Sequence, residues 1–554
     1  MHSPASAIRI TTAYPVSVPR RSVCRAHMPL QTNPLPLICA VPLSGGHLMP
    51  QKRRKSAYAW LWVLALAALS AAISITHYKI GDSDYYWHCM YGQILATTHK
   101  MPATDPVSWL AAESGLHYID YSWFCDLLLY KLSLLGPIET YGGLLFFLLF
   151  SIPVTILIFG LWGQGVIQRL QQGWQTALLS LAILVGCLVL QLPADPCSRP
   201  KLVSLLLFIL SVYWIQKPGF KCFPTIFIAI LWANLHGTAL PALFILQAGA
   251  LFLDALPTFN ANCLQFTHDK NWFPRLLILL LSLLAGGINP YGFRLYSQLA
   301  EIQRASKIIH ITELSPSTLN LSASTFAAQQ SSAAMILLLL LLVYLIFCPH
   351  KIPAKNLLPV AMTGCMMLLH VRFIGWFFAA LTIFILQEAD RLLPICEVSN
   401  KHARPQCAIL AAPILGSVLW CTFQFAPTAE NARPIRYPSE TLLEVIATQN
   451  PQHLYSSAIG TGTFFAYNGT PCFVDSRIEL YPSEVLHDFQ VLEGSVPYTD
   501  TTIDYFGPII DKYQFDMMVL CQHDNVGLTA YMSQRSDWQL IYTSSVYAVF
   551  VPKT

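Results

Sequence analysis

Long apolar stretches recur along most of this chain and are separated by short polar segments. A helix needs roughly 20 mostly apolar residues to cross about 30 Å of hydrocarbon. The clearest stretches are residues 57–76, 141–163, 176–193, 202–216, 224–254, 275–288, 332–348, 356–370, 373–387 and 408–426. Because 224–254 is too long for one crossing, the pattern predicts about 11 transmembrane helices.

The pattern changes after residue 426. Charged and turn residues return in 427–554, and no stretch there is long enough to cross a bilayer. Helical spacing of apolar residues alternates with short strand-like runs. The expected helices are 440–448, 483–492 and 501–513, and the expected strands are 453–455, 515–520, 538–543 and 546–552. This order predicts a polytopic α-helical membrane protein with a small C-terminal α/β soluble domain.

The N-terminal segment 1–56 is rich in Pro and Ser and has no periodicity, which predicts a disordered basic cytoplasmic tail. Met49 stands directly before the basic run QKRRK at 51–55, so translation begins either at Met1 or at Met49. Basic residues beside a membrane helix favour the cytoplasmic side. We therefore expect a large external loop at 79–120 within a transmembrane domain at 57–426. With an odd number of crossings, 427–554 is extracytoplasmic at the plasma membrane.

Composition and charge narrow the function. The chain is 54% hydrophobic and 11% charged, which argues for a membrane protein, and a net charge of +4 gives no reason to expect nucleic-acid binding. The 15 cysteines form no CxxC pair and are interpreted as small hydrophobic residues. The sequence also has no phosphate-binding P-loop, dinucleotide fingerprint, HExxH or GxSxG motif, which excludes ATP-driven and serine-hydrolase chemistry.

Two acids stand where the first predicted helix leaves the membrane. In GDSDYYWH, residues 81–88, Asp82 and Asp84 follow the apolar stretch so closely that they should lie at headgroup level. The reactive bond of a lipid-linked phosphate would lie at the same depth. Such a carboxylate either acts as a general base or binds a divalent cation, Mg²⁺ or Mn²⁺, that neutralises a phosphate leaving group.

Basic residues at helix ends are candidates for holding that phosphate. Arg199 and Lys201 precede one apolar stretch, and Arg372 lies at the end of another. Charges at membrane depth tend to face polar cavities, although an arginine at a helix end also snorkels to the surface. His236 interrupts the stretch 224–254 and either lines a cavity or makes a hydrogen bond between helices.

The run FVDSRIELY, residues 473–481, reads as a short apolar strand followed by acidic and basic residues. Asp475 and Arg477 would either face a crevice at the strand end or form a local ion pair that fixes the loop. The external loop adds three further candidates for binding substrate: His88, Asp105 and Asp120.

Several of these motifs together resemble a known family. They are GDSDYYWHCMYGQI, MPATDPVSW, YIDYSWFCDLLLY, SRPKLVSLLLF, LWANLHGTALPA, INPYGFRLY and FVDSRIELYP. Their order is similar to that in a subgroup of bacterial GT-C-type integral membrane glycosyltransferases with a small external C-terminal domain. In that superfamily an acid just after the first span is catalytic, and the resemblance places this role on Asp82 or Asp84, with Asp84 slightly favoured and also the tentative metal ligand.

The resemblance implies an inverting transfer of a sugar from a polyprenyl-phosphate donor to an extracytoplasmic acceptor, which would be a cell-surface glycan, a lipid or a protein. His88 and His236 would shape the sugar site, while Arg199, Lys201 and Arg372 would hold the phosphate. Two alternatives stay open. One is a transporter or flippase of a lipid-linked glycan, for which the sequence shows no repeat symmetry. The other is a non-catalytic membrane scaffold.

Overall fold

The computed structural model describes residues 57–77, 84–135, 139–191, 199–270, 272–309, 312–322, 326–348, 350–398, 438–494 and 504–553. The predicted tail at 1–56, the predicted span at 408–426 and Asp82 lie outside the described residues.

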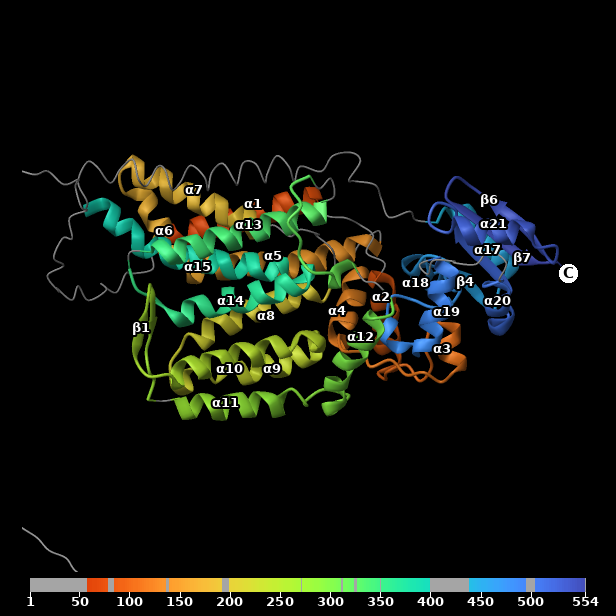
Figure 1. Ribbon diagram of the computed structural model, residues 1–554, viewed down its shortest axis with the longest axis horizontal. Helices are drawn as coiled ribbons and strands as arrows, with labels where there is room; N and C mark the ends of the chain where they lie inside the picture. The colour runs from red at the N-terminus through yellow and green to blue at the C-terminus, as the bar shows by residue number, and fades with distance from the viewer. Residues whose placement is uncertain are drawn as a thin grey trace, which may run out of the picture. The chain divides into compact units, whose positions relative to one another are not determined.

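A bundle of apolar helices makes up the larger part of the structure (Figure 1). Its members are α1 (Ala57–His77), α5 (Glu139–Leu161), α7 (Trp174–Gln191), α8 (Lys201–Ile215), α9 (Pro224–Leu235), α10 (Pro241–Ala255), α11 (Trp272–Ala285), α13 (Phe326–Phe347), α14 (Ala354–Leu369) and α15 (Ile374–Val398). Within the described ranges, 6 helical segments are long and apolar enough to cross a membrane, and four shorter apolar helices accompany them. Their length and composition support the predicted membrane protein, while the total of about 11 crossings stays a prediction.

The overlong stretch 224–254 is resolved by a break at His236. There α9 ends, and a 3-10 turn, η3 (Gly237–Ala239), leads into α10. Trp232, in the last turn of α9, is fully buried and donates from its indole nitrogen to the Ser204 hydroxyl of α8 at 2.8 Å. A buried indole N–H needs such a partner, since an unpaired donor in an apolar bundle is costly.

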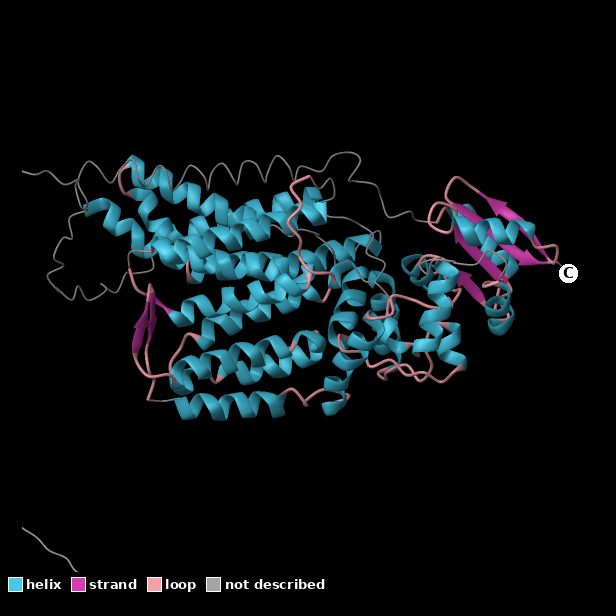
Figure 2. Cartoon of the chain, in the orientation of Figure 1, coloured by secondary structure: helices cyan, strands magenta, loops and turns pink. Residues whose placement is uncertain are grey.

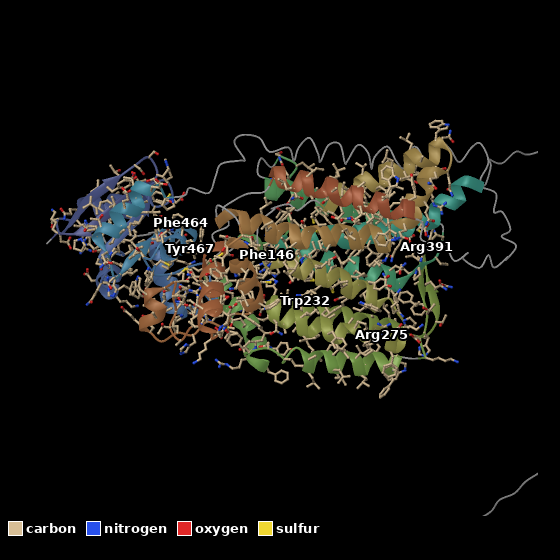
Figure 3. All side chains as sticks on the ribbon, turned by 180° about the vertical axis from the view of Figure 1, so that it is seen from behind. Phe146, Trp232, Arg275, Arg391, Phe464 and Tyr467 are labelled. Carbon is tan, nitrogen blue, oxygen red and sulfur yellow. The ribbon has the colours of Figure 1, made fainter. Side chains whose placement is uncertain are left out.

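Basic side chains mark one end of the bundle. Arg275 of α11 is buried there and pairs with Asp254 of α10, with 2.6 Å between Nε and Oδ2. Figure 3 shows Arg275 and Arg391 at the end of the bundle away from Phe464 and Tyr467. The same end carries a three-stranded sheet in the order β1-β2-β3, formed by β1 (Phe259–Ala261), β2 (Leu264–Phe266) and β3 (Ile352–Pro353).

The predicted external loop is largely helical and lies at the other end of the bundle. It contains α2 (Asp84–Thr98), α3 (Trp109–Glu113) and α4 (Trp123–Ser133). Helices α2 and α4 cross very closely, because a Cβ atom at Gly92 would lie 2.1 Å from the carbonyl oxygen of Asp126. The helical bundle also has shorter elements between its long helices. They are α6 (Gln164–Gln168), η1 (Arg169–Gln171), η2 (Gly219–Cys222), η4 (Gly292–Ser297), α12 (Gln298–Ser306), η5 (Thr312–Leu314) and η6 (Val371–Phe373).

Residues 438–553 contain a four-stranded sheet in the order β4-β5-β7-β6 (Figure 2). The strands are β4 (Leu454–Ser456), β5 (Met517–Cys521), β6 (Trp538–Thr543) and β7 (Tyr547–Pro552). The helices are α17 (Glu440–Gln449), α18 (Ile459–Tyr467), α19 (Ser483–Glu493), α20 (Gly507–Tyr513) and α21 (Val526–Gln534), with η7 (Ile478–Leu480) between α18 and α19.

Both faces of this sheet are covered by helices. Along β5, Met517 and Val519 belong to the apolar cluster that includes Leu442 of α17, whereas Met518 and Leu520 belong to the cluster that includes residues of α19, α20 and α21. All five β5 residues are buried, as expected for a central strand with helices on both sides.

The C-terminal strands coincide closely with the predicted ones, but the short apolar strand expected just before Asp475 is not formed. Cys472 makes only isolated bridges, to Ser108 and Leu454, and the chain then turns into η7. Polar groups in the following residues bind each other instead of extending a ladder. Helices α18 and α21 were not expected from the pattern.

Candidate functional site

Asp84 lies at the first position of α2, beside an arginine from a distant part of the chain. Its Oδ2 is 3.5 Å from Nη2 of Arg199, and Nη1 of the same arginine is 2.9 Å from Oε1 of Glu313. All three side chains are partly exposed: Asp84 by 22%, Arg199 by 25% and Glu313 by 36%. An arginine in such a partly exposed position can also contact an anionic ligand.

The predicted cationic residues stand at the starts of helices that meet at this end of the bundle. Lys201 begins α8, Arg372 lies in η6 just before α15, and His236 precedes η3 and α10. The pKa of His236 is lowered to about 3, first by burial and then by the positive charges of Arg372, His88 and Lys201. These side chains are therefore close enough to act on one another, and the exposed N–H groups of the helix starts add further positive potential.

The break at His236 ties α9 to the first loop. The backbone N–H of Gly237 donates to the carbonyl oxygen of Tyr121 at 2.7 Å. A Cβ atom at Gly237 would lie 2.7 Å from the side chain of Leu295, so a larger residue would force this contact apart. His236 is held by a 2.6 Å contact between its Nδ1 and the Ser204 hydroxyl. The interhelical hydrogen bond expected as one alternative for His236 is thus present.

His88 and Asp120 lie deeper, between α2 and α4. Nδ1 of His88 is 2.7 Å from Oδ1 of Asp126, and both residues are buried. The pKa of Asp120 is raised well above its usual value, first by burial and then by the nearby charge of Asp126. Burial likewise raises the pKa of Asp126. Each of these buried carboxyls therefore disfavours ionisation more strongly than an exposed aspartate does.

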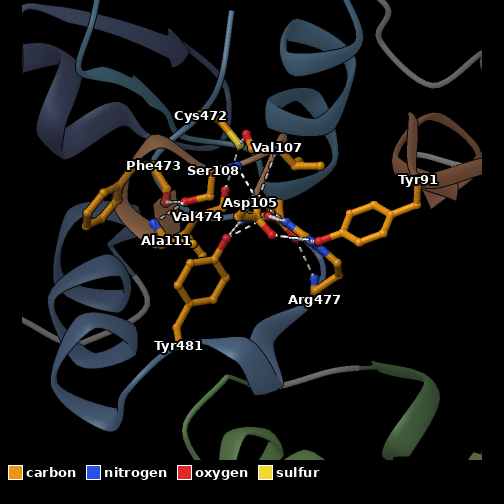
Figure 4. Close-up of polar contacts among 11 residues, drawn as sticks. Tyr91, Asp105, Val107, Ser108, Ala111, Cys472, Phe473, Val474, Arg477 and Tyr481 are labelled. Carbon is orange, nitrogen blue, oxygen red and sulfur yellow. Dashed lines mark hydrogen bonds and ion pairs between the residues drawn. The ribbon is translucent and has the colours of Figure 1, made fainter. Parts of the chain in front are cut away.

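Asp105, Asp475 and Arg477 form a separate, buried cluster that joins the first loop to the C-terminal segment (Figure 4). Arg477 binds Asp105 with Nη1–Oδ2 and Nη2–Oδ1 distances of 2.7 and 2.9 Å. It binds Asp475 with Nε–Oδ1 and Nη2–Oδ2 distances of 2.9 and 2.6 Å. Tyr91 donates to Asp105 at 2.8 Å and Tyr481 donates to Asp475 at 2.6 Å. We call these five residues the Arg477 clamp.

Three residues of the clamp, Asp105, Asp475 and Arg477, were predicted from the sequence to bind substrate. Burial opposes ionisation of Asp105, but the charge and hydrogen bonds of Arg477 hold the pKa of this carboxyl below its usual value. The local ion pair between Asp475 and Arg477, one of the two alternatives for these residues, is observed, and their charged atoms point at each other instead of into a crevice. A role in substrate binding for the three charged residues stays a prediction.

Some residues at this site were not among the predicted candidates. Glu313 was missed because nothing in the sequence links it to Arg199. Glu479 follows the clamp directly and is buried, with an exposed fraction of 8%. Its pKa is raised to about 7, chiefly by burial. The acidic run DSRIE was the available signal, but it could not distinguish a paired acid from an unpaired one.

The described residues do not fit a divalent-cation site. They contain no group of three or more His, Cys, Asp or Glu side chains placed to hold a metal ion. Around Asp84, the guanidinium of Arg199 occupies the position between two carboxylates where a cation would be expected. The positive charge there is supplied by the chain itself.

Comparisons with solved structures find an archaeal oligosaccharyltransferase and a bacterial ArnT. An oligosaccharyltransferase from Archaeoglobus fulgidus, tethered with an acceptor peptide, matches with 11% identity and a TM-score of 0.45 over 89% of this chain and 74% of its own. ArnT from Cupriavidus metallidurans matches with 13% identity and a TM-score of 0.47 over 88% of this chain and 97% of its own. The same enzyme bound to undecaprenyl phosphate matches with 12% identity and a TM-score of 0.44 over 89% and 98%.

Both proteins are GT-C-type glycosyltransferases, the class that the sequence motifs resemble. No family model matches the sequence, and a search of curated proteins finds no relative. Because all of these TM-scores lie below 0.5, we argue function from the residues of the site alone.

Proposed function

We propose that this protein transfers a sugar, with inversion, from a polyprenyl-phosphate donor to an acceptor on the outer side of the cytoplasmic membrane. The observation that carries the proposal is that Arg199 pairs with Asp84 just before α8, while the charges of Lys201 and Arg372, at the starts of α8 and α15, act on His236 at the start of η3. A phosphate on a lipid tail needs positive charge at the end of an apolar bundle, and this end provides it.

In this proposal the basic residues bind the leaving phosphate. Arg199 offers planar donors, Lys201 adds a mobile ammonium, and Arg372 adds a second guanidinium at the start of α15. Their charge stabilises the phosphate as it takes the electron pair of the breaking sugar–oxygen bond. His236 stays neutral because its pKa is low, so it shapes the site by hydrogen bonding.

Asp84 faces the same site with a carboxylate. It can accept the proton of the attacking hydroxyl, or it can balance the positive charge that develops on the sugar ring in an oxocarbenium-like transition state. The expected dependence on Mg²⁺ or Mn²⁺ stays a prediction. It is tested by measuring sugar transfer by the purified protein before and after dialysis against EDTA.

Mass spectrometry of a deletion strain tests the proposed function. We expect a polyprenyl-phosphate monosaccharide to accumulate and the corresponding sugar to disappear from a surface glycan, lipid or protein. Restoring the wild-type gene should reverse both changes. A donor that moves only from one leaflet to the other would indicate flipping, and the absence of any change in lipid-linked sugars would refute the transferase.

A further inference from the structure

A pocket lies between the first loop, α12 and the C-terminal segment. Its volume is about 450 Å³, within the range of about 300–1,000 Å³ that is usual for small-molecule sites. The first loop lines it with residues 116–119, α12 contributes Gln298, Glu301 and Arg304, and the C-terminal segment contributes residues 479–483. The bundle end and the C-terminal segment therefore build this pocket together.

The lining of the pocket is suited to a carbohydrate. His117, Gln298, Glu301 and Ser483 offer hydrogen-bonding groups, while the ring of Tyr118 supplies an apolar wall. Arg304 fixes the junction by donating to Glu301 at 2.8 Å, to Ser483 at 3.1 Å and to the carbonyl of Tyr481 at 2.9 Å. A few placed polar groups beside an apolar surface favour a ligand with several hydroxyl groups.

Glu479 is the buried acid of this pocket, and one of its oxygens is not satisfied. Among the residues that the structure describes, Oε1 of Glu479 has no hydrogen-bond partner. Natural proteins rarely leave a buried carboxylate oxygen unpaired, because doing so costs free energy without contributing to the fold. A buried acid with an unpaired oxygen is the arrangement expected of a group with a catalytic role.

Tyr121 connects this acid to the donor site. The pKa of Tyr121 is raised first by burial, and both Glu479 and Asp84 act on it, as does Arg372. Glu479 also feels the charge of Asp84, in addition to those of Arg477 and Asp475. The ring of Tyr118, which lines the pocket, lies 5.9 Å from that of Tyr121, and the ring of Tyr121 lies 6.0 Å from that of His236. The pocket is therefore linked to the proposed donor site through two neighbouring aromatic rings.

We propose that this pocket binds a hydroxyl-bearing carbohydrate acceptor and that the carboxylate of Glu479 is the base that takes the proton from its attacking hydroxyl. This inference rests on the proposed transferase function. The acceptor oxygen forms a bond to the anomeric carbon, the bond from that carbon to the phosphate oxygen breaks, and polyprenyl phosphate leaves with the electron pair. The proton moves to Glu479 and is then released to solvent, and Asp84 balances charge on the sugar.

The role of the base has a consequence for the pH dependence. Glu479 has to be ionised to accept a proton, and its pKa is about 7. The charges of Arg477, Asp475 and Asp84 act on it. Tyr118 and Tyr121 of the first loop also face it, and Arg304 of α12 donates to its carbonyl oxygen at 3.4 Å. Transfer should therefore rise about tenfold between pH 6 and pH 8, as the ionised fraction rises.

The test compares substitutions at Glu479 in the full-length protein. In the complemented deletion strain, Glu479→Gln should lower transfer by about 10²- to 10⁴-fold and lead to donor accumulation. Purified in lipid nanodiscs, the same variant should bind undecaprenyl phosphate within twofold of the wild type. Glu479→Asp should retain part of the transfer. Glu484→Gln serves as the matched control, because Glu484 lies five positions away and pairs with Lys512 at the surface.

A second measurement does not depend on any substrate. Dicyclohexylcarbodiimide reacts with protonated carboxyls in apolar surroundings, so the wild type should be labelled at Glu479 at pH 6 and several-fold less at pH 8.5. The inference would be overturned if the Glu479→Gln variant transferred sugar at the wild-type rate. It would also be overturned if labelling of Glu479 in the wild type did not depend on pH. Failure of the deletion strain to accumulate a lipid-linked sugar would instead refute the proposed function itself.

Discussion

Asp105 and Asp84 belong to the same loop but have opposite surroundings. Every oxygen of Asp105 accepts hydrogen bonds: Oδ1 from the backbone of Val107 and Ser108 and from Arg477, and Oδ2 from Tyr91 and Arg477. Asp84 is partly exposed and lies 3.5 Å from its arginine, which is long for an ion pair.

This difference separates a carboxylate that holds the structure together from one that is available for chemistry. A buried ion cluster with all its groups paired is rigid, and removal of one member leaves the others charged and unsolvated. A reacting carboxylate needs room for a substrate. The Arg477 clamp fixes the first loop against the C-terminal segment, whereas Asp84 is partly exposed and Glu479 lines a pocket, so both have that room.

The largest effect on stability should come from the clamp. Arg477→Met would leave Asp105 and Asp475 buried without their cation, at a cost of about 3–5 kcal/mol. Denaturant unfolding in detergent, followed by tryptophan fluorescence, measures this loss. Arg535→Met is the control, since Arg535 pairs with the exposed Asp537 and its loss should cost no more than about 1 kcal/mol. Equal losses of unfolding free energy in the two variants would show that the clamp stabilises the fold no more than a surface ion pair does.

Asp84→Asn should strongly reduce sugar transfer but hardly change the free energy of unfolding. Transfer should fall by about 10²- to 10³-fold because a charge aimed at the transition state is lost. Unfolding should change by less than about 1 kcal/mol, since the pair with Arg199 is partly exposed. Donor and product measured in the complemented deletion strain report the first value, and thermal unfolding of the purified variant reports the second. A variant that unfolds but transfers normally when folded would place Asp84 with the structural acids.

Much of the fold could be predicted because apolar periodicity is a local signal. The expected strand at 538–543 coincides with β6, and the apolar stretch 356–370 corresponds to α14. Helix α18 escaped prediction because its glycines and threonines, in IGTGTFFAY, favour no regular structure, and packing against α2 decides its conformation. Its aromatic residues Phe464 and Tyr467 lie 5.0 and 5.2 Å from the ring of Tyr86.

The candidate site was only partly predictable, because pairing between distant residues leaves no local pattern. The position of Asp84 after an apolar stretch predicted that it lies at the end of a bundle helix, and in the structure it begins α2, which follows α1. Asp105 and Arg477 are 372 positions apart in the sequence, and no local pattern indicated that their side chains bind each other. Glu479 and Asp475 stand in one short motif and both are buried, so only the ion pair of Asp475 with Arg477 distinguishes them.

Arg199→Lys should weaken the grip on the donor without removing the positive charge. Loss of the planar fork should cost roughly 1.5–3 kcal/mol of phosphate binding, or about 10- to 100-fold in the dissociation constant for undecaprenyl phosphate. Titration of the purified protein in nanodiscs measures this constant. Lys307→Arg is a suitable control because Lys307 lies just beyond α12 and begins no apolar helix. An unchanged constant in the Arg199 variant would remove this residue from the phosphate site.

The smallest expected effect concerns the buried acids Asp120 and Asp126. Burial raises both pKa values, so the folded protein binds more protons than the unfolded chain at pH values above the ordinary aspartate range. Stability should therefore fall as pH rises from about 4 through these raised values, by at most about 1.4 kcal/mol per pH unit for each proton. Asp126→Asn should reduce this slope, because one ionisable group and its repulsion of Asp120 are both removed. Melting curves between pH 5 and pH 8 test the point, and an unchanged slope would contradict a raised pKa at Asp126.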